Sequence, residues 1–149
     1  MNLLDKQILN RLQKGLPLVA RPFQALADEM GIEEERMLER IRHLMSEGVI
    51  RRLGGVFNSQ RLGFQSTLVA LKAPLERVEE VAGVINAYPE VTHHYLRDHE
   101  EYTLWFTLIA PSKERIQEIL DEISSKTGLR EMRNLPARRL FKIQVDFPL

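Results

Sequence analysis

The chain contains no cysteine, and this absence excludes several kinds of chemistry. Without thiols there is no disulfide, no thiolate metal site and no cysteine nucleophile. No window approaches the roughly 18 uninterrupted apolar residues that a membrane-spanning helix requires. The first residues also lack the basic start and the long apolar run of a signal peptide. We therefore expect a cytoplasmic protein.

The sequence also lacks an excess of charge of either sign, because 21 Lys and Arg residues balance 21 Asp and Glu residues. Proteins that bind nucleic acid usually carry an excess of basic residues. The net charge shows no such excess, although acidic residues elsewhere can mask a local basic patch. The 149 residues, 44% of them apolar, suit one ordinary domain or two small ones.

Apolar residues with helical spacing predict three helices in the first third of the chain. The first carries Leu4, Ile8, Leu9 and Leu12, and the others cover 23–30 and 33–47. The glycines that follow the second and third segments are typical helix stops. Residues 49–53 and 56–57, separated by a Gly-Gly pair, predict a short hairpin. Three helices and a hairpin form a winged helix-turn-helix, which we assign to residues 1–60.

The pattern changes after the short polar bridge at 58–63. Strand and helix signals then alternate, with strands expected at 66–72, 91–98, 102–109 and 140–147 and helices at 75–87 and 112–126. The order β-α-β-β-α-β is that of the ferredoxin-like fold. We assign it to residues 61–149, so the fold class of the chain is α+β.

One face of such a sheet is covered by the two helices, and the other is left for a partner or a ligand. On the third strand, Leu104, Phe106 and Leu108 alternate with more polar residues, so we expect them to meet the helices. The second strand then places four residues in a row on the open face, near Trp105: His93, Tyr95, Arg97 and His99. The neighbouring His94 is expected to point the other way.

A winged helix-turn-helix joined to a ferredoxin-like domain resembles the Lrp/AsnC regulators. Five segments resemble more closely one enzymatic branch of that superfamily, the siroheme decarboxylases. They are LPLVARPF (16–23), IRRLGGVFNS (50–59), VTHHYLR (91–97), YTLWFT (102–107) and LPARRLFKI (135–143). The strand pair that contains Trp-Phe-Thr-Leu is much more specific than the helix-turn-helix.

The resemblance implies an activity, the conversion of siroheme to 12,18-didecarboxysiroheme with loss of carbon dioxide from two acetate side chains. The reaction serves an alternative haem route or haem d1 formation. Members of the branch often work as two related subunits, so a homodimer or a heterodimer with a related subunit is implied. The reaction needs no cofactor beyond the iron of the siroheme, and no metal site of the protein itself.

The residue chemistry is consistent with this activity. Loss of carbon dioxide from a pyrrole acetate needs a positioned proton donor, and histidine suits neutral pH. Arginine binds carboxylates through paired hydrogen bonds, and aromatic side chains shield a flat macrocycle. The candidates are His93 and His99 as proton donors, Arg97 with Arg51 or Arg52 as cations, and Tyr95 with Trp105 as the wall.

Each candidate also has a simpler interpretation. A strand histidine is usually a surface or interface residue, and His99 at a hairpin turn suits a solvated turn residue. Tyr95 and Trp105 are compatible with an interface between subunits. Arg51 and Arg52 are compatible with contacts to DNA phosphates.

Two alternative functions follow from the same residues. The first is a transcription regulator of the Lrp/AsnC type. The third helix would then enter the major groove, but its N-terminal end carries three glutamates at 33–35, the wrong charge for a polyanion. We therefore expect no DNA partner. The second is a haem-sensing module without turnover, which needs the same aromatic and basic surface and which only product analysis separates from the enzyme.

Overall fold

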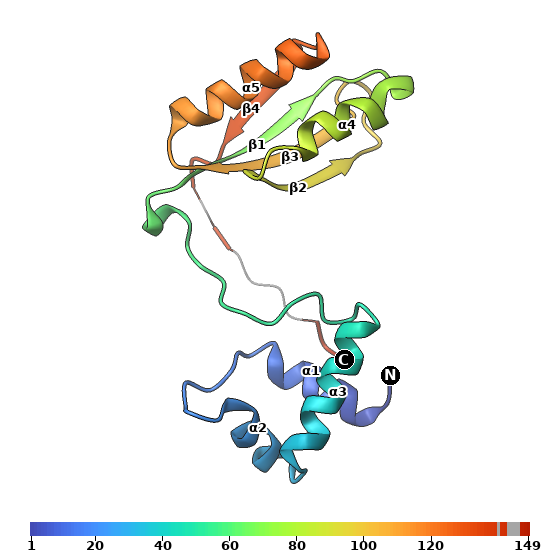
Figure 1. Ribbon diagram of the computed structural model, residues 1–149, viewed down its shortest axis with the longest axis vertical. Coiled ribbons are helices and arrows are strands. Elements are labelled where there is room, and N and C mark those ends of the chain that lie inside the picture. The colour runs from blue at the N-terminus through green and yellow to red at the C-terminus, as the bar shows by residue number, and fades with distance from the viewer. Residues whose placement is uncertain (140, 143–146) are drawn as a thin grey trace. The chain divides into compact units, whose positions relative to one another are not determined.

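The computed structural model describes residues 1–139, 141–142 and 147–149. The chain forms two compact units (Figure 1). A helical unit comprises Met1–Gly55 and Lys142–Leu149, and an α+β unit comprises Val56–Phe141. No helix among the described residues is long and apolar enough to cross a membrane.

The helical unit contains the three predicted helices, α1 (Leu3–Leu12), α2 (Pro22–Met30) and α3 (Glu34–Ser46). Proline at the first position of α2 fits because its missing N–H would have no helical partner there. Gly31 ends α2 in the left-handed conformation, with φ of 64°, which costs glycine no steric strain. The three helices bury a small apolar core that includes Ile8, Leu26, Met37 and Ile41.

A buried ion pair joins α1 to α3. The Asp5 side chain is only 1% exposed and receives two hydrogen bonds from Arg40, from Nε at 2.9 Å and from Nη2 at 3.1 Å. Asp5 also accepts the backbone N–H of Asn2 in a capping box at the start of α1. The hydrogen bond from Arg40 is the main reason that the pKa of Asp5 lies below its ordinary value.

The hairpin predicted across 49–57 is not formed, since none of these residues lies in a strand. Ile50 is buried and Leu53 packs against it on the helical core, so the segment follows the helices instead of pairing with itself. Val56 and Phe57 are 84% and 77% exposed. An arm of two residues without a buried face gives a hairpin little stability, which explains the wrong prediction.

The α+β unit has the predicted order of strands and helices. Its elements are η1 (Gln60–Leu62), β1 (Gln65–Leu71), η2 (Leu75–Arg77), α4 (Val78–Asn86), β2 (Val91–Leu96), β3 (Leu104–Ala110), α5 (Lys113–Thr127) and β4 (Met132–Pro136). The strands form one antiparallel sheet in the order β2-β3-β1-β4, and α4 and α5 cover one of its faces (Figure 1). This is the ferredoxin-like arrangement expected from the sequence.

The last strand lies earlier in the chain than predicted. β4 is Met132–Pro136, whereas the prediction placed a strand at 140–147. Residues 140 and 143–146 of that prediction lie outside the described residues, and 141, 142 and 147 are not in a strand. β4 is an edge strand that is mostly exposed and ends at a proline, so it lacks the apolar alternation by which a strand is recognised. Farther along the chain, Phe147 exchanges two backbone–side-chain hydrogen bonds with Gln13, the residue that follows α1.

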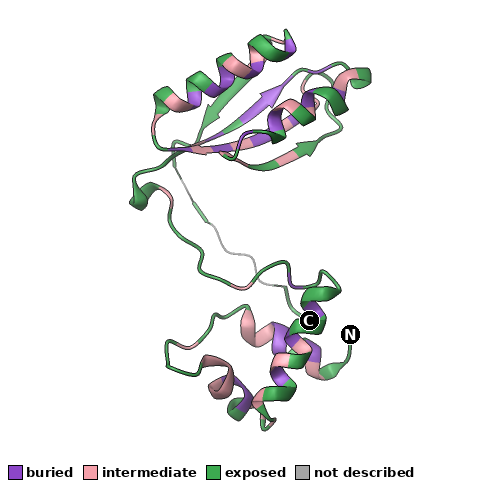
Figure 2. Ribbon diagram, viewed as in Figure 1, coloured by how far each residue is buried: buried purple, intermediate pink, exposed green. Residues whose placement is uncertain are grey.

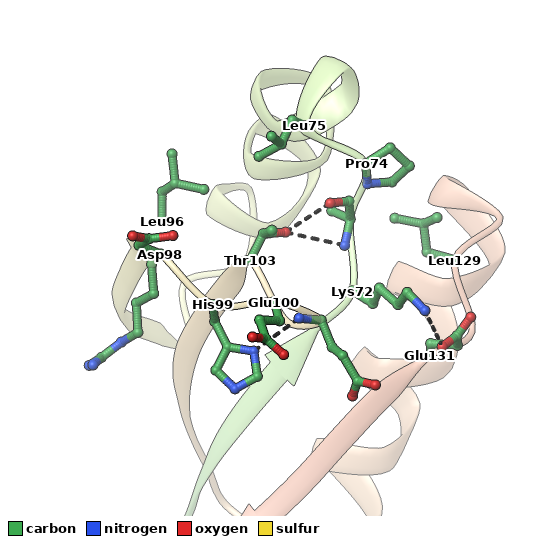
Figure 3. Close-up of a pocket in the computed structure, with 13 residues that line it drawn as sticks. Lys72, Pro74, Leu75, Leu96, Asp98, His99, Glu100, Thr103, Leu129 and Glu131 are labelled. Atoms are coloured by element: carbon green, nitrogen blue, oxygen red, sulfur yellow. Dashed lines mark hydrogen bonds and ion pairs between the residues drawn. The ribbon is translucent and has the colours of Figure 1, made fainter.

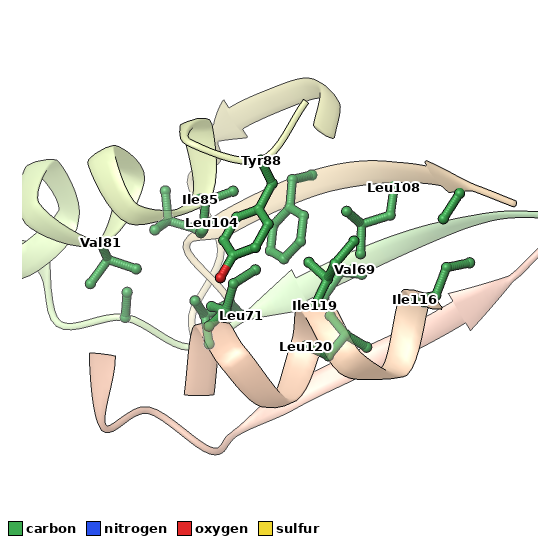
Figure 4. Close-up of a cluster of buried hydrophobic side chains, with 14 of the residues drawn as sticks. Val69, Leu71, Val81, Ile85, Tyr88, Leu104, Leu108, Ile116, Ile119 and Leu120 are labelled. Carbon is green, nitrogen blue, oxygen red and sulfur yellow. The ribbon is translucent and has the colours of Figure 1, made fainter. Parts of the chain in front are cut away.

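The core of the α+β unit lies between the sheet and its two helices (Figure 4). Burial alternates along β3, where Leu104, Phe106 and Leu108 are fully buried under the helices, as predicted. Isoleucines 116, 119 and 123 of α5 pack onto them. Figure 2 shows the same contrast, with buried residues in purple along the central strands β1 and β3 and exposed residues in green along most of β2 and β4.

A bulge at Thr92 decides which side chains of β2 reach the open face. Val91 pairs with Leu108 and His93 pairs with Thr107, so two steps on β2 match one step on β3. Val91 therefore packs against the core, while His93 points to the opposite side. The alternation is regular from His93 onward, and the predicted row keeps its face.

Candidate active site on the open face of the sheet

The open face carries the predicted row of aromatic and basic side chains. Tyr95 is the register partner of Trp105, and His93 is the partner of Thr107, so these side chains share the face opposite to the helices. Tyr95 is 50% exposed. The structure therefore confirms the side of the sheet on which the row was expected.

Arg97 contacts two aromatic rings on the same face of the sheet. Its guanidinium carbon is 5.8 Å from the centre of the Tyr95 ring and 5.6 Å from that of Trp105. Both distances are within the range of a cation–π contact, which orients the guanidinium without using its N–H groups. Among the described residues no carboxylate lies within ion-pair distance of Arg97. The N–H donors of Arg97 are thus suited to an external anion.

His93 begins the row. Its ring stacks on Tyr95, with centroids 6.3 Å apart and planes inclined by 25°. Nδ1 lies 3.1 Å from the Thr92 hydroxyl, a contact that orients the imidazole. Among the described residues Nε2 has no hydrogen-bond partner, so it is available to exchange a proton with a ligand on the open face.

His99 organises the loop between β2 and β3. Its Nδ1 accepts the backbone N–H groups of Glu101 and Tyr102, both at 3.1 Å. The neutral ring therefore carries its hydrogen on Nε2. The same ring lies 5.9 Å from Trp105 and 5.9 Å from Tyr102. His99 is thus a turn residue, which agrees with the simpler interpretation given above. Its ring also contacts Trp105 and Tyr102.

His94 points to the helix side, as predicted. Its Nδ1 lies 2.9 Å from Asn86 Oδ1, and its ring meets the edge of Phe106 with centroids 5.7 Å apart. Nε2 is buried without a hydrogen-bond partner among the described residues. Burial lowers the pKa of His94 because the charged imidazolium would lose its hydration there.

A pocket of about 630 Å³ lies at the end of the sheet where β2 turns into β3 (Figure 3). Arg97 and His99 line it together with Lys72, but so do four carboxylates, which belong to Asp98, Glu100, Glu101 and Glu131. Lys72 is paired with Glu131 at 3.1 Å, and this hydrogen bond raises the pKa of Lys72. The excess of carboxylates disfavours a polyanion in the pocket, so the open face is the better site for a carboxylated ligand.

Arg51 and Arg52 belong to a different unit from the row of aromatic and basic residues. Both belong to the helical unit and are exposed between Ile50 and Leu53, whose side chains face the helical core. The row itself belongs to the α+β unit.

Two residues of the cluster escaped the sequence analysis, Tyr102 and Arg133. Arg133 Nε donates a hydrogen bond to the Tyr102 hydroxyl at 2.7 Å, and its guanidinium carbon is 5.9 Å from the centre of that ring. Arg133 was missed because its strand was expected about ten residues later in the chain. Tyr102 is the first residue of the YTLWFT segment, and this position in a family-specific segment could have identified it as a site residue.

Comparison with known families agrees with this architecture. The family model described as an AsnC-like ligand binding domain matches residues 61–142. A second model, described as a siroheme decarboxylase NirDL-like HTH domain, matches residues 5–51. The fold and these matches define a protein of the Lrp/AsnC-like class.

Similar proteins narrow the class further. The siroheme decarboxylase alpha subunit of Desulfovibrio desulfuricans is 48% identical over 147 residues, which cover 99% of this chain and 84% of that protein. The siroheme decarboxylase NirD subunit of Stutzerimonas stutzeri is 44% identical, over 98% of this chain and 94% of the relative. The chain belongs to the siroheme decarboxylase family, as the five sequence segments predicted.

Solved structures give the same result. The crystal structure of the siroheme decarboxylase NirDL matches with a TM-score of 0.73 and 36% identity over 97% of this chain. This chain spans about half of NirDL, 47% of its length. A second NirDL structure, a co-complex with an iron-uroporphyrin III analogue, matches equally well, with a TM-score of 0.73. AsnC of E. coli matches with a TM-score of 0.78 but only 16% identity, which shows the shared fold alone.

Proposed function

We propose that the chain is a siroheme decarboxylase subunit, a carbon–carbon lyase that removes carbon dioxide from the acetate side chains of siroheme to give 12,18-didecarboxysiroheme. The product belongs to an alternative haem route or to haem d1 formation. The observation that carries the proposal is the Arg97 guanidinium in contact with the rings of Tyr95 and Trp105 on the open sheet face, with His93 and His99 in ring contact with these aromatics.

Each residue of the row has a part in substrate binding or proton transfer. Arg97 binds a peripheral carboxylate of the macrocycle through paired, charge-assisted hydrogen bonds. Tyr95 and Trp105 form an apolar floor against which the flat ring system lies. Arg51 and Arg52 are assigned to further carboxylates of the same substrate.

The reaction consumes one proton for each carbon dioxide released. The bond between the acetate methylene and its carboxylate carbon breaks, and carbon dioxide leaves. The electron pair stays on the methylene, conjugated with the macrocycle, until a proton converts the methylene to a methyl group. His93 is the main proton donor because it lies on the open face and its Nε2 has no hydrogen-bond partner among the described residues, and His99 supplies a second N–H from its own Nε2. The reaction uses no cofactor beyond the iron that siroheme itself contains.

Residues 61–149 are proposed as the ligand-binding and catalytic domain and residues 1–60 as a helix-turn-helix scaffold. The start of α3, which would meet DNA in a regulator, carries Glu34 and Glu35 in its first turn. The guanidinium of Arg40 is used internally on Asp5. Both features weaken attraction to phosphates, so DNA is not a proposed partner.

The working enzyme is proposed to be a cytoplasmic dimer, either of this chain or with a related subunit. The names of the relatives, alpha subunit and NirD subunit, describe parts of a larger assembly. The exposed aromatic face offers a surface for a second sheet, so that the macrocycle would be enclosed on both sides.

The proposal is tested by product analysis. The chain, alone and with a related subunit, is incubated with siroheme without oxygen, and the products are followed by mass spectrometry. Successive losses of carbon dioxide are expected. Tight binding of siroheme without loss of carbon dioxide, in the presence of the related subunit, would show that the chain is a haem-sensing module and not an enzyme. Specific binding to operator DNA with no effect on siroheme would favour a regulator.

A further inference from the structure

The open face carries a second arginine, on the opposite edge of the sheet from Arg97. Register partners connect one row across all four strands, from Tyr95 through Trp105 and Ala70 to Arg133. Partners in an antiparallel sheet point to the same face, so Arg133 shares the face of the proposed site. Three strand spacings separate the β2 edge from the β4 edge, about 14 Å.

Tyr102 holds the Arg133 side chain in place. The bond from Arg133 Nε to the Tyr102 hydroxyl, at 2.7 Å, joins β4 to the loop that precedes β3, and β1 lies between these two strands. The side chains of Tyr102 and Arg133 therefore meet across β1, whose member of the row, Ala70, is only 1% exposed.

The bond to Tyr102 uses only Nε of Arg133, so the two terminal nitrogens keep their N–H donors. Among the described residues no carboxylate lies within ion-pair distance of Arg133. Glu131, the residue before β4, is paired with Lys72. An oriented guanidinium without a protein anion is suited to a carboxylate from outside.

We propose that Arg133, positioned by Tyr102, is a second carboxylate-binding residue of the site and that the macrocycle lies across the sheet between Arg97 and Arg133. The inference rests on the proposed siroheme substrate. A tetrapyrrole carries carboxylates around its whole periphery, and its breadth is comparable to the separation of the two edges. One cation near each edge fixes both the position and the rotation of the ring, which a single clamp does not.

The test measures binding separately from turnover. The complex with the related subunit is titrated with iron uroporphyrin, and binding is followed by the porphyrin absorbance and by quenching of tryptophan fluorescence, to which this chain contributes Trp105 alone. Arg133→Gln is expected to weaken binding about 10- to 100-fold, the range for a charge-assisted hydrogen-bonded pair. Arg133→Lys keeps the charge and is expected to recover part of the affinity. Tyr102→Phe keeps the ring and loses only the hydroxyl, so a smaller loss of a few-fold is expected.

Arg130→Gln is the matched control, because it removes one exposed positive charge close in sequence to Arg133 but outside the row. Circular dichroism of all variants shows that the fold is kept. A loss of affinity in Arg133→Gln no larger than in Arg130→Gln would overturn the proposal, and so would the absence of binding by the wild-type complex. If binding depends on Arg133 but siroheme is never decarboxylated, the second clamp stands and the proposed activity fails.

Discussion

Replacement of His93 by alanine is expected to slow decarboxylation far more than it weakens substrate binding. A positioned general acid contributes about 10² to 10⁴ in rate, which corresponds to roughly 3 to 5 kcal/mol of the activation free energy. The His93 imidazole stacks on Tyr95 and contacts the Thr92 hydroxyl, and all three residues are exposed. Loss of these contacts costs about 1 kcal/mol or less, so stability and affinity change by a few-fold at most.

The assay is a single turnover of siroheme with excess enzyme under anaerobic conditions. It separates the chemical step from product release, and mass spectrometry resolves the first and the second decarboxylation. Repeating the reaction in deuterium oxide places deuterium in the new methyl group and reports whether proton transfer limits the rate. His93→Ala is expected to lower the single-turnover rate while the dissociation constant of iron uroporphyrin stays within a few-fold of the wild-type value.

A matched control is His43→Ala, which removes an exposed histidine from α3 in the helical unit and is expected to leave the rate unchanged. His99→Ala serves a different purpose. It removes the acceptor of two backbone N–H groups, so the loop is expected to loosen and affinity to fall together with rate. A single-turnover rate for His93→Ala within a few-fold of wild type would refute its role as the proton donor.

Three further predictions concern charge. Arg97→Ala is expected to weaken iron uroporphyrin binding about 10- to 100-fold in an absorbance titration, and unaltered affinity would count against the clamp. Burial lowers the pKa of His94 in the folded state, so as pH falls the unfolded chain binds this proton first. Its contribution to stability is therefore complete above the ordinary histidine value of about 6.5 and is lost as pH falls from there toward the lowered folded-state value. Urea unfolding across this range is expected to show that loss, and the same slope in His94→Gln would contradict the assignment. Arg40→Ala leaves the buried Asp5 carboxylate uncompensated and is expected to cost about 2 to 4 kcal/mol of unfolding free energy. The substitution is expected to cost much less in an Asp5→Asn background, and equal losses in both backgrounds would show that the pair is not coupled.

The sequence was sufficient to predict the parts of the fold in which burial follows a regular period. The alternation of Leu104, Phe106 and Leu108 identified both the strand and its buried face, and the glycine after α2 marked the end of that helix. These features are local, since each depends only on which side of one element meets the core. The same reasoning predicted that His94 and Tyr95 lie on opposite faces.

Features that depend on neighbouring strands were not predictable in this way. β4 is an edge strand whose side chains are largely exposed, so its residues show no apolar period, and the later apolar segment was taken for the last strand. Arg133 was missed for this reason, and with it the link to Tyr102. The hairpin after α3 was predicted from two short segments on either side of a Gly-Gly pair, but hairpin stability depends on a buried face that residues 49–57 do not provide.

The bulge at Thr92 explains how β2 serves the core and the open face within a few residues. Strict alternation would place Val91 and His93 on the same face, so either valine would leave the core or histidine would enter it. The extra residue puts Val91 over Leu108 and His93 beside Thr107. The Thr92 hydroxyl then lies 3.1 Å from Nδ1 of the same histidine, so one residue both reverses the face of the strand and orients the imidazole. The position of the proposed proton donor is therefore a consequence of the register between β2 and β3, which holds Arg97 and Trp105 as well.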